Sequence, residues 1–583
     1  MHAKNKLRIL LIAASFFTVQ AFAQPIVKLW DKTIGGNFAD FNIANMLITP
    51  SKKIMVACIS NSDAGFDKTA SRKDTIYCTG TSCVGTWVFT LDKNGHKLWD
   101  QTYGGIGVGI LHTKVFGLVQ QNANSYMLGC SIWPTDSTGD LTDPYTFPGT
   151  VNGSGIWILD IDSLGNKIWN KRYFAQNMYF YFNDMILNDD NIYMSCSIGS
   201  IGAQPQYGNF FPPSCYLGMN DPRAVIFKIN AQTKAFDWSF YFRSEVSNSL
   251  LKSKSNSLLM AGVSDSVIVC NKTIGSHGLG DYGLVSTDTL GNIQWQKNYG
   301  GSLLEKIVDV IATNDGGYLL YGRTSSPQGF DISQTGYNDT SLWVVKIDSL
   351  GTKLWDKRFG SCTKTGVINN NFGSGKESAN HLAINTSDGG FLLATSITGA
   401  PCGDVTEVAR GPLDYWLLKI DQNGVKQWDK RYGCLGNNYA ESLAEMDTGI
   451  YLIGGTVATS TFVDNSGIGG DKTEDTRGSG DLWFVCFADT TVANLTSVNE
   501  IYQANSSLSI WPNPANDVLN YTLTGNEKIK NIVLSNMLGE KVLEINSPST
   551  NAIPTNQLKS GVYLFKCETT KGKRFIKKVM VTK

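Results

Sequence analysis

Apolar and polar residues alternate in short runs along most of the chain. In one such run Trp343, Val345 and Ile347 fall on one face, and an Asp-x-x-Gly segment then leads to a second run ending near Trp355. Alternation with a period of two is typical of a β-strand, and Asp and Gly are typical of a tight turn. Because no long segment shows convincing 3.6-residue periodicity, the pattern predicts an all-β protein built from hairpins.

The hairpin recurs along the sequence. Six complete copies begin at Thr86, Ile156, Ala224, Tyr282, Leu342 and Tyr415. The second-strand tryptophans Trp30, Trp99, Trp169, Trp238, Trp295, Trp355 and Trp428 follow one another at intervals of 57 to 73 residues. A unit of this length holds four strands, the size of one propeller blade. A second motif, similar to Asp-Gly-Gly-Tyr-Leu-Leu, occurs seven times and predicts seven blades.

The two ends of the repeat region complement each other. Residues 26–36 match the second strand of the hairpin and residues 481–489 match the first. Pairing of these half-hairpins closes the ring and removes two exposed sheet edges. The fold predicted is therefore a seven-bladed β-propeller closed by its N- and C-terminal strands.

The repeated residues have structural explanations. The Asp-x-x-Gly segments at 92–95, 162–165, 288–291, 348–351 and 421–424 are explained by turn chemistry alone. Twelve of the fourteen tryptophans occupy repeat positions, with Trp133 and Trp511 as the exceptions. We expect these twelve to pack between blades instead of forming a platform for ligands.

The N-terminus predicts export. An apolar stretch over residues 7–17 follows Lys4 and Lys6 and is broken only by Arg8. An Ala-x-Ala site then predicts cleavage between Ala23 and Gln24. The predicted organisation is a signal peptide over 1–23, the propeller over 24–489, a linker over 490–505 and a C-terminal module over 506–583. A membrane anchor is the alternative for the first segment, and no later segment is apolar enough to span a bilayer.

Charge and cysteine content narrow the range of partners. The chain has 50 Lys plus Arg and 50 Asp plus Glu residues, so no excess of basic residues points to nucleic acid or an anionic membrane as a partner. We also expect the protein to be a monomer. Cys58, Cys130 and Cys196 lie in apolar runs and predict buried thiols. Two disulfides remain open: Cys78 with Cys83, and Cys402 with either Cys362 or Cys434.

The repeat resembles the propeller repeats common in exported proteins of Bacteroidetes. The resemblance covers about residues 24–489 and rests on the Asp-x-Trp, Asp-x-x-Gly and Trp-x-Lys-x-x-Gly-Gly elements of the hairpin. It implies a fold and an origin but no particular activity.

The C-terminal module has several short alternating runs and resembles a type A sorting domain of the type IX secretion system. The residues that carry the resemblance are Trp511, Pro512, Asn513, Pro514, Gly539, Gly561 and Tyr563, together with a Lys-rich final strand. The resemblance implies a small Ig-like β-sandwich, contact with the secretion machinery, and delivery to the medium or the outer cell surface. An ordinary Ig-like adhesive module is the alternative.

Motifs for catalysis are absent from the sequence. It contains no His-Glu-x-x-His, Gly-x-Ser-x-Gly, Cys-x-x-Cys or P-loop pattern, and His96, His112, His277 and His381 are expected to be structural. No cofactor is expected, apart from a calcium ion that Asp136, Asp140 and Asp143 could hold in one acidic loop.

The variable parts of the repeat are long connections between the second and third strands of each blade. They include residues 61–85, 133–155, 199–223, 325–341 and 459–480. Function usually lies on long loops held by a rigid scaffold, so this face is the predicted binding face. The leading hypothesis is a non-enzymatic surface or secreted protein that binds a glycan, a peptide or a surface protein. The alternatives are a glycoside hydrolase or lyase with its site on this face or in the channel, and a structural spacer.

Overall fold

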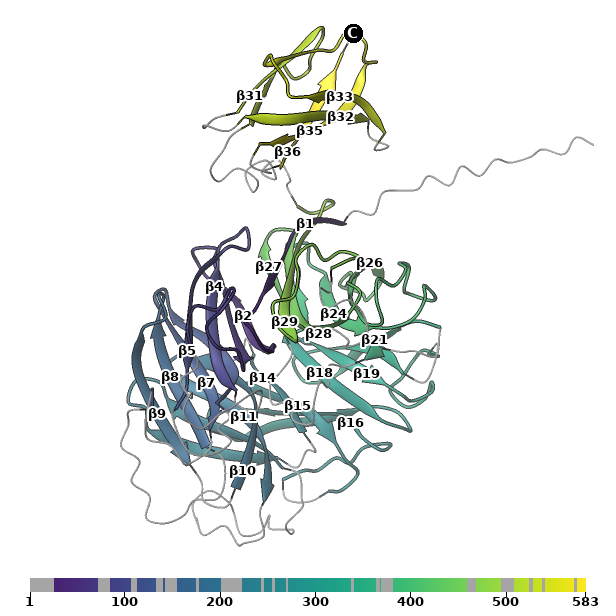
Figure 1. Ribbon diagram of the computed structural model, residues 1–583. Coiled ribbons are helices and arrows are strands. Elements are labelled where there is room, and N and C mark those ends of the chain that lie inside the picture. Colours follow the sequence, from purple (N-terminus) through teal and green to yellow (C-terminus); the bar gives the residue numbers. More distant parts are fainter. Residues whose placement is uncertain are drawn as a thin grey trace, which may run out of the picture. The chain divides into compact units, whose positions relative to one another are not determined.

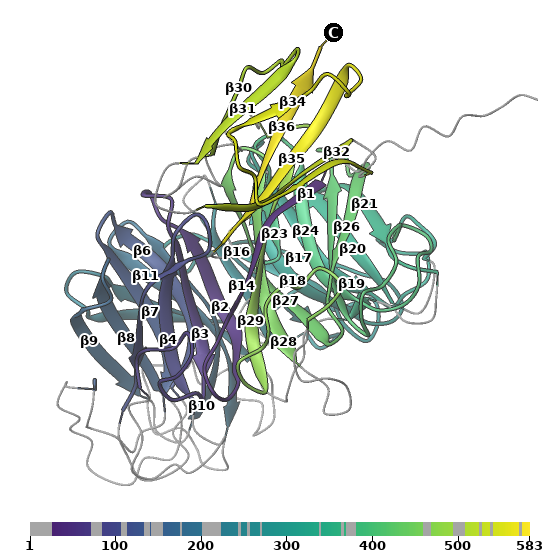
Figure 2. The ribbon, with the colours of Figure 1, turned by 45° about the horizontal axis from the view of Figure 1, so that its top comes forward.

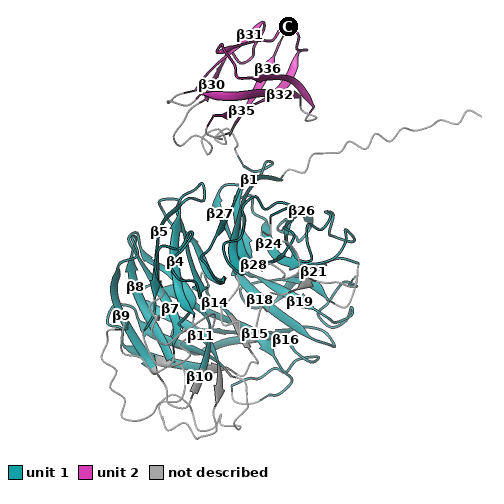
Figure 3. Cartoon of the chain, in the orientation of Figure 1, with its two compact units in different colours: residues 1–494 teal, residues 495–583 magenta. Residues whose placement is uncertain are grey.

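The computed structural model divides the chain into two compact units, residues 1–494 and 495–583 (Figure 3). The structure describes residues 26–71, 84–105, 113–132, 140–141, 155–174, 178–200, 223–242, 246–253, 257–268, 271–336, 340–362, 367–368, 381–458, 468–493, 508–523, 528–536, 540–570 and 574–582. The predicted signal peptide lies outside these residues.

The first unit contains seven antiparallel sheets, which we number as blades 1 to 7 in ring order. Blade 1 is β2 (Asp40–Ile48), β3 (Ile54–Ser60), β4 (Gly85–Leu91) and β5 (Lys97–Tyr103). Blade 2 is β6 (Lys114–Asn122), β7 (Ser125–Ile132), β8 (Gly155–Asp162) and β9 (Lys167–Phe174). Blade 3 is β10 (Met178–Asn188), β11 (Asn191–Ser200), β12 (Arg223–Asn230) and β13 (Phe236–Phe242). Blade 4 is β14 (Val246–Lys252), β15 (Leu258–Ser264), β16 (Asp281–Thr287) and β17 (Ile293–Tyr299).

Blade 5 is β18 (Glu305–Ala312), β19 (Tyr318–Thr324), β20 (Ser341–Ile347) and β21 (Lys353–Phe359). Blade 6 has its inner strand in two pieces, β22 (Val367–Ile368) and β23 (Ala383–Asn385), followed by β24 (Phe391–Ile397), β25 (Asp414–Ile420) and β26 (Lys426–Tyr432). Blade 7 is β27 (Asn437–Asp447), β28 (Ile450–Ala458), β29 (Gly480–Asp489) and β1 (Ile26–Ile34).

The inner strands form a closed ring. Contacts run from β2 to β6, β10, β14, β18, β23 and β27, and from β27 back to β2 (Figure 1). Each blade thus packs on the next, and the predicted seven-bladed propeller is confirmed.

The ring closes as the two half-hairpins predicted. β1 pairs antiparallel with β29, from Ile26 opposite Asp489 to Ile34 opposite Leu482 (Figure 2). The connections between strands define two ends of the ring. At one end, which we call the loop end, lie the long connections between the second and third strands of each blade and the connections from one blade to the next. At the other end, which we call the turn end, lie the short turns within the blades. Both chain connections of the ring, at Ile26 and Asp489, lie at the turn end.

The repeated turn and tryptophan residues have the expected structural roles. In the turn at 92–95 the backbone amides of Asn94 and His96 donate to Asp92 Oδ1 at 2.8 and 2.9 Å, and Gly95 has a φ of 82°. The third-strand tryptophans Trp87, Trp157, Trp343, Trp416 and Trp483 are fully buried. These observations confirm a turn-forming role for the aspartate and glycine and a core role for these five tryptophans.

The second unit contains two small sheets around one core. One sheet is β30 (Leu508–Trp511), β31 (Val518–Leu523) and β34 (Ala552–Pro554), and the other is β33 (Lys541–Asn546), β32 (Ile529–Asn536), β35 (Gly561–Thr569) and β36 (Arg574–Val581). Side chains of both sheets, including Leu519, Leu534 and Phe565, share the buried cluster. None of the described residues forms a helix long and apolar enough to cross a membrane.

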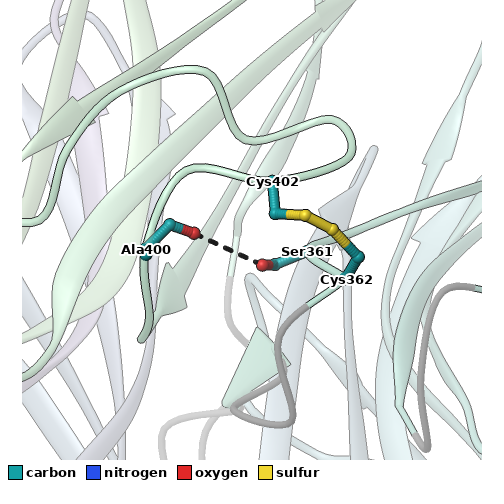
Figure 4. Close-up of a disulfide and its surroundings, with 4 residues drawn as sticks. All are labelled: Ser361, Cys362, Ala400 and Cys402. Atoms are coloured by element: carbon teal, nitrogen blue, oxygen red, sulfur yellow. Dashed lines mark hydrogen bonds between the residues drawn. A yellow bond between two sulfur atoms is a disulfide. The ribbon is translucent and has the colours of Figure 1, made fainter.

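One predicted disulfide is present. Cys362 is bonded to Cys402, with 5.3 Å between their Cα atoms, and Ser361 Oγ lies 3.5 Å from Ala400 O beside it (Figure 4). Cys434, the other partner that had been considered, is a buried free thiol, as are Cys58, Cys130 and Cys196. Cys78 and Cys83 lie outside the described residues.

We expect the disulfide to stabilise the loop end of blade 6. It closes a segment of 40 residues, for which loop-closure entropy gives about 2–4 kcal/mol. Cys362→Ala, Cys402→Ala and the double variant should each lower the free energy of unfolding of the full chain by this same amount, measured by denaturant titration. Losses that add in the double variant would contradict the bond, because a disulfide is lost completely with either cysteine.

Candidate functional site: the loop end of the propeller

Four described long loops contain the same tight turn, which we call the loop-end turn. The four turns are residues 65–68, 329–332, 402–405 and 469–472, in blades 1, 5, 6 and 7. The backbone amide of the fourth residue donates to the carbonyl of the first at 3.0 to 3.2 Å. The second residue has positive φ in every case, at Phe66, Phe330, Gly403 and Gly470. The repeat was not predicted from the sequence, although the first three residues of each turn end in aspartate. They are Gly-Phe-Asp in blades 1 and 5, Cys-Gly-Asp in blade 6 and Gly-Gly-Asp in blade 7.

The third residue of each turn is an aspartate that holds the connection entering its blade. In blade 5, Asp331 N donates to Gly300 O at 3.1 Å, and Gly300 N donates to Asp331 Oδ2 at 3.1 Å. The equivalent pairs are Asp67 with Gly35, Asp404 with Gly360 and Asp471 with Gly433. These two-way bonds fix the loop-end turns in place on the ring.

Asp140, one of the three residues predicted to hold calcium, occupies this same position in blade 2. Its amide donates to Gly104 O at 3.1 Å, and Gly104 N donates to its Oδ2 at 3.3 Å. Asp136 and Asp143 lie outside the described residues. Within the described ranges no group of three or more Asp, Glu, His or Cys residues could hold a metal ion. Calcium binding stays a prediction, and Asp140 has a structural role of its own.

The residue after each turn joins the loop to the outer strand. In blade 1, Thr69 N donates to Asp100 Oδ2 at 2.9 Å, and the buried Trp87 Nε1 donates to the same oxygen at 3.0 Å. Burial alone would raise the pKa of Asp100, but hydrogen bonds from Lys97, Thr69 and Trp87 outweigh it and lower that pKa. The same arrangement recurs as Ser333–Asp356–Trp343, Thr406–Asp429–Trp416 and Thr473–Asp31–Trp483.

A second repeat that was not predicted from the sequence bridges neighbouring blades. It has an arginine or histidine, then glycine, two variable residues and aspartate, and we call it cation-Gly-x-x-Asp. Arg477 Nε lies 3.0 Å from Asp67 Oδ2, and its backbone amide donates to Asp481 Oδ2. Arg410 N donates to Asp414 Oδ2 at 2.8 Å, and its Nε lies 3.1 Å from Asp471 Oδ2.

His277 occupies the equivalent place between blades 4 and 5. Its backbone amide donates to Asp281 Oδ2 at 2.8 Å, and its Nδ1 lies 3.0 Å from Asp281 Oδ2 and 3.8 Å from Asp331 Oδ2. Its ring packs on Phe330, with 4.9 Å between ring centroids. A histidine that was expected to be structural therefore lies beside an exposed aromatic ring.

Phe66 and Phe330 are the exposed aromatic residues of the loop-end turns. They are 69% and 68% exposed, and their φ angles are 54° and 51°. A bulky side chain in this backbone region costs of order 1–2 kcal/mol. The other two turns have Gly403 and Gly470 at this position, which adopt it without that cost. The fold itself therefore does not require phenylalanine there.

Acidic side chains with raised pKa values lie below this surface. Burial, together with Asp40, raises the pKa of Asp481 to about 7, and burial also raises the pKa of Asp40 and of Asp281. All three are fully buried. A Cβ on Gly35 would lie 2.1 Å from Asp481 Oδ1, so glycine is needed for this close approach.

The acids of the inner strands join one blade to the next. Asp184 Oδ2 accepts from Leu250 N at 2.8 Å, and Asp309 Oδ2 accepts from Leu382 N at 3.1 Å and from Ala383 N at 3.2 Å. Burial raises the pKa of Asp309 to about 7 and also raises that of Asp184. These acids are completely enclosed by the ring, and their backbone contacts explain them as structural.

In the second unit four of the predicted sorting residues, Trp511 to Pro514, belong to one anchored loop. Asn513 Nδ2 donates to Lys578 O at 3.1 Å, and Met580 N donates to Asn513 Oδ1 at 2.7 Å. Asn513 thus holds the loop that also contains Trp511, Pro512 and Pro514 against β36. Gly561 begins β35, and Tyr563 Oη donates to Lys559 O at 2.8 Å. Gly539, Ala23 and Gln24 lie outside the described residues.

Residues 509–582 match the family model described as the secretion system C-terminal sorting domain. A domain of this kind brings its protein to the type IX secretion machinery. The chain is therefore a propeller protein that is exported to the medium or to the outer cell surface. No curated protein sequence matches the chain.

Several solved structures are similar to the chain at low identity. Hydrazine synthase of Kuenenia stuttgartiensis matches with a TM-score of 0.37 and 10% identity, covering 72% of this chain and 93% of its own. The WD40 β-propeller domain of Doa1 matches at 0.35 and 11%, covering 79% and 96%. The acylaminoacyl peptidase of Pyrococcus horikoshii matches at 0.33 and 8%, covering 73% and 59%. The strand pairing and the closed ring of inner strands establish the propeller independently of these matches.

Proposed function

We propose that this exported propeller is a non-enzymatic binding protein and that its loop end is the binding surface. The observation that carries the proposal is the pair of exposed phenylalanines, Phe66 and Phe330, in left-handed backbone conformations. Backbone strain that the fold does not need is most often retained for function.

Exposure alone does not distinguish the two ends of the ring. Leu164, Leu290 and Leu350 at the turn end are 62%, 72% and 69% exposed. These leucines lie in unstrained Asp-x-x-Gly turns, whereas the two phenylalanines hold a costly conformation. Both chain connections, at Ile26 and Asp489, leave the ring at the turn end.

The buried acids favour binding over catalysis. A general acid or base must reach the reacting atom of the substrate within hydrogen-bond distance. Asp481 and Asp309, whose pKa values are raised to about 7, are fully buried and accept backbone N–H bonds. Their shifts are therefore explained by enclosure in the ring, not by an exposed site.

The test is a binding screen of the mature full chain against a glycan array and an array of extracellular matrix and cell-surface proteins. Phe66→Gly combined with Phe330→Gly should weaken saturable binding by tenfold or more, because two anchoring rings are lost. The double variant should also be more stable, by about 1 kcal/mol for each phenylalanine, because glycine relieves the strain.

Leu350→Gly is the matched control, since it removes an equally exposed side chain at the turn end. It should leave binding unchanged. Binding that the double variant retains, or no saturable binding on either array, would contradict the proposal. Hydrolysed or eliminated products released from a bound glycan would show an enzyme instead.

A further inference from the structure

We propose that the loop end binds a protein partner through an apolar surface where blades 4 and 5 meet, which we call the junction patch. The patch consists of Leu279, Leu303 and Phe330, which are 72%, 43% and 68% exposed. The inference rests on the proposed function and adds the position of a main contact and the class of the partner. That partner is an extracellular protein with a cluster of exposed aliphatic and aromatic side chains.

The three residues lie on segments that are hydrogen-bonded to one another. Leu279 N donates to Leu303 O at 2.8 Å, and Leu303 N donates to Ser326 Oγ at 2.7 Å, in the loop that leads to Phe330. The ring of Phe330 packs on the ring of His277, which stands two residues before Leu279, with 4.9 Å between ring centroids. These contacts place the three side chains on neighbouring parts of one fixed surface.

The polar groups around the junction patch are largely bonded within the protein. Gly300 and Asp331 exchange two hydrogen bonds, and the loop-end turn closes on itself between Gly329 and Ile332. The Nδ1 of His277 lies 3.8 Å from Asp331 Oδ2, so the charged groups of this junction face each other. In this described part of the chain, the surface offered to a partner is therefore mainly C–H surface.

The class of the partner follows from this surface. A glycan has many hydroxyls and needs free donors and acceptors in its site. The centre of a protein–protein interface is apolar, with aromatic residues enriched and charged residues depleted. The junction patch therefore suits an apolar protein surface better than a glycan. Because the sorting domain brings the chain out of the cell, that protein is extracellular.

The junction of blades 7 and 1 supplies a comparison within the same chain. In the cation-Gly-x-x-Asp repeat, Ser479 stands at the position of Leu279, and Arg477 stands at that of His277. Arg477 Nε lies 3.0 Å from Asp67 Oδ2, so this junction has a hydroxyl and a charged pair near its loop-end turn. The fold therefore does not require an apolar residue at position 279, where a leucine that is 72% exposed adds little to the core.

The experiment is a selection of random 12-residue peptides, displayed on phage, against the immobilised mature full chain. The affinities of the enriched peptides are then measured in solution. We expect these peptides to contain two or more Leu, Ile, Phe or Trp residues. Leu279→Ser should weaken their binding about tenfold, the factor typical of an exposed leucine that becomes buried in a complex. Raising NaCl from about 0.1 to 0.5 M should change the affinity less than twofold, because apolar contacts are not screened.

Leu290→Ser is the matched control. Leu290 belongs to the same blade, lies at the turn end and is also 72% exposed. This variant should leave peptide binding unchanged. Because both leucines are exposed, neither substitution should disturb the core, and equal thermal midpoints of the two variants and the native chain check this.

The outcomes separate this inference from the proposed function. Equal losses of affinity in the two leucine variants, or enriched peptides that are highly charged and bind weakly at high salt, would overturn the inference. The absence of any enriched peptide would also overturn it, and saturable binding of an array glycan would then keep the proposed function. Binding that the double phenylalanine variant retains would overturn both.

Discussion

Arg431→Met should lower the free energy of unfolding of the propeller by about 3–5 kcal/mol at pH 8, the usual cost of breaking a buried ion pair. Arg431 Nη2 lies 2.8 Å from Asp414 Oδ2, and both side chains are fully buried. Arg431 also donates to Gly399 O at 2.8 Å. The variant leaves the Asp414 carboxylate enclosed without its cation, and denaturant titration of the full chain measures the loss.

Blade 5 supplies a matched control for this prediction. Arg358 occupies the equivalent strand position but donates to the neutral Ser341 Oγ at 3.1 Å. Arg358→Met should therefore cost only about 1–3 kcal/mol, because the hydrogen bonds that it removes end on a neutral hydroxyl and on a backbone carbonyl. An equal loss in both variants would contradict the role given to Asp414.

The pH dependence gives a second check on Arg431→Met. Burial already raises the pKa of Asp414, and loss of the arginine should raise it further. A carboxyl with a raised pKa in the folded state is protonated there first, so the variant regains stability as the pH falls and loses it as the pH rises. The gap from the native chain should be largest at pH 8 and smallest near pH 4.

Removal of residues 508–583 should abolish delivery of the protein to the medium and the outer surface. These residues contain the whole match to the sorting domain and have their own core. The propeller closes on itself through β1 and β29 and should stay folded without them. Immunoblots of cell fractions should find the truncated chain in the periplasm, with little or none outside the cell.

The matched control is Lys541→Ala, which changes an exposed side chain of the same module. It should leave extracellular delivery unchanged. Normal delivery of the truncated chain would contradict the sorting role of this domain.

The fold could be predicted because it is repetitive. The spacing of Trp30, Trp99 and their successors fixed the blade length, and the two half-hairpins at the ends fixed the closure. These features depend on strand alternation and turn chemistry, which act locally and leave a clear pattern in the sequence. The free thiols of Cys58, Cys130 and Cys196 followed from the same pattern.

The candidate site was harder to predict because its parts come from different blades. Asp67, the neighbour of Phe66, meets Arg477 only when blade 7 closes on blade 1, some 400 residues later in the chain. The left-handed conformation of Phe330 cannot be predicted from its residue type, because glycine is the residue expected in that conformation. The short repeats Gly-x-Asp and cation-Gly-x-x-Asp were visible, but their role depends on contacts between blades.

The central claim is that the loop end binds the ligand. Its most direct test is a crystal structure of the full chain with the array ligand of highest affinity. The account predicts that this ligand contacts the exposed rings of Phe66 and Phe330. A ligand bound at the turn end, over Leu350 and its equivalents, or inside the central channel would contradict it.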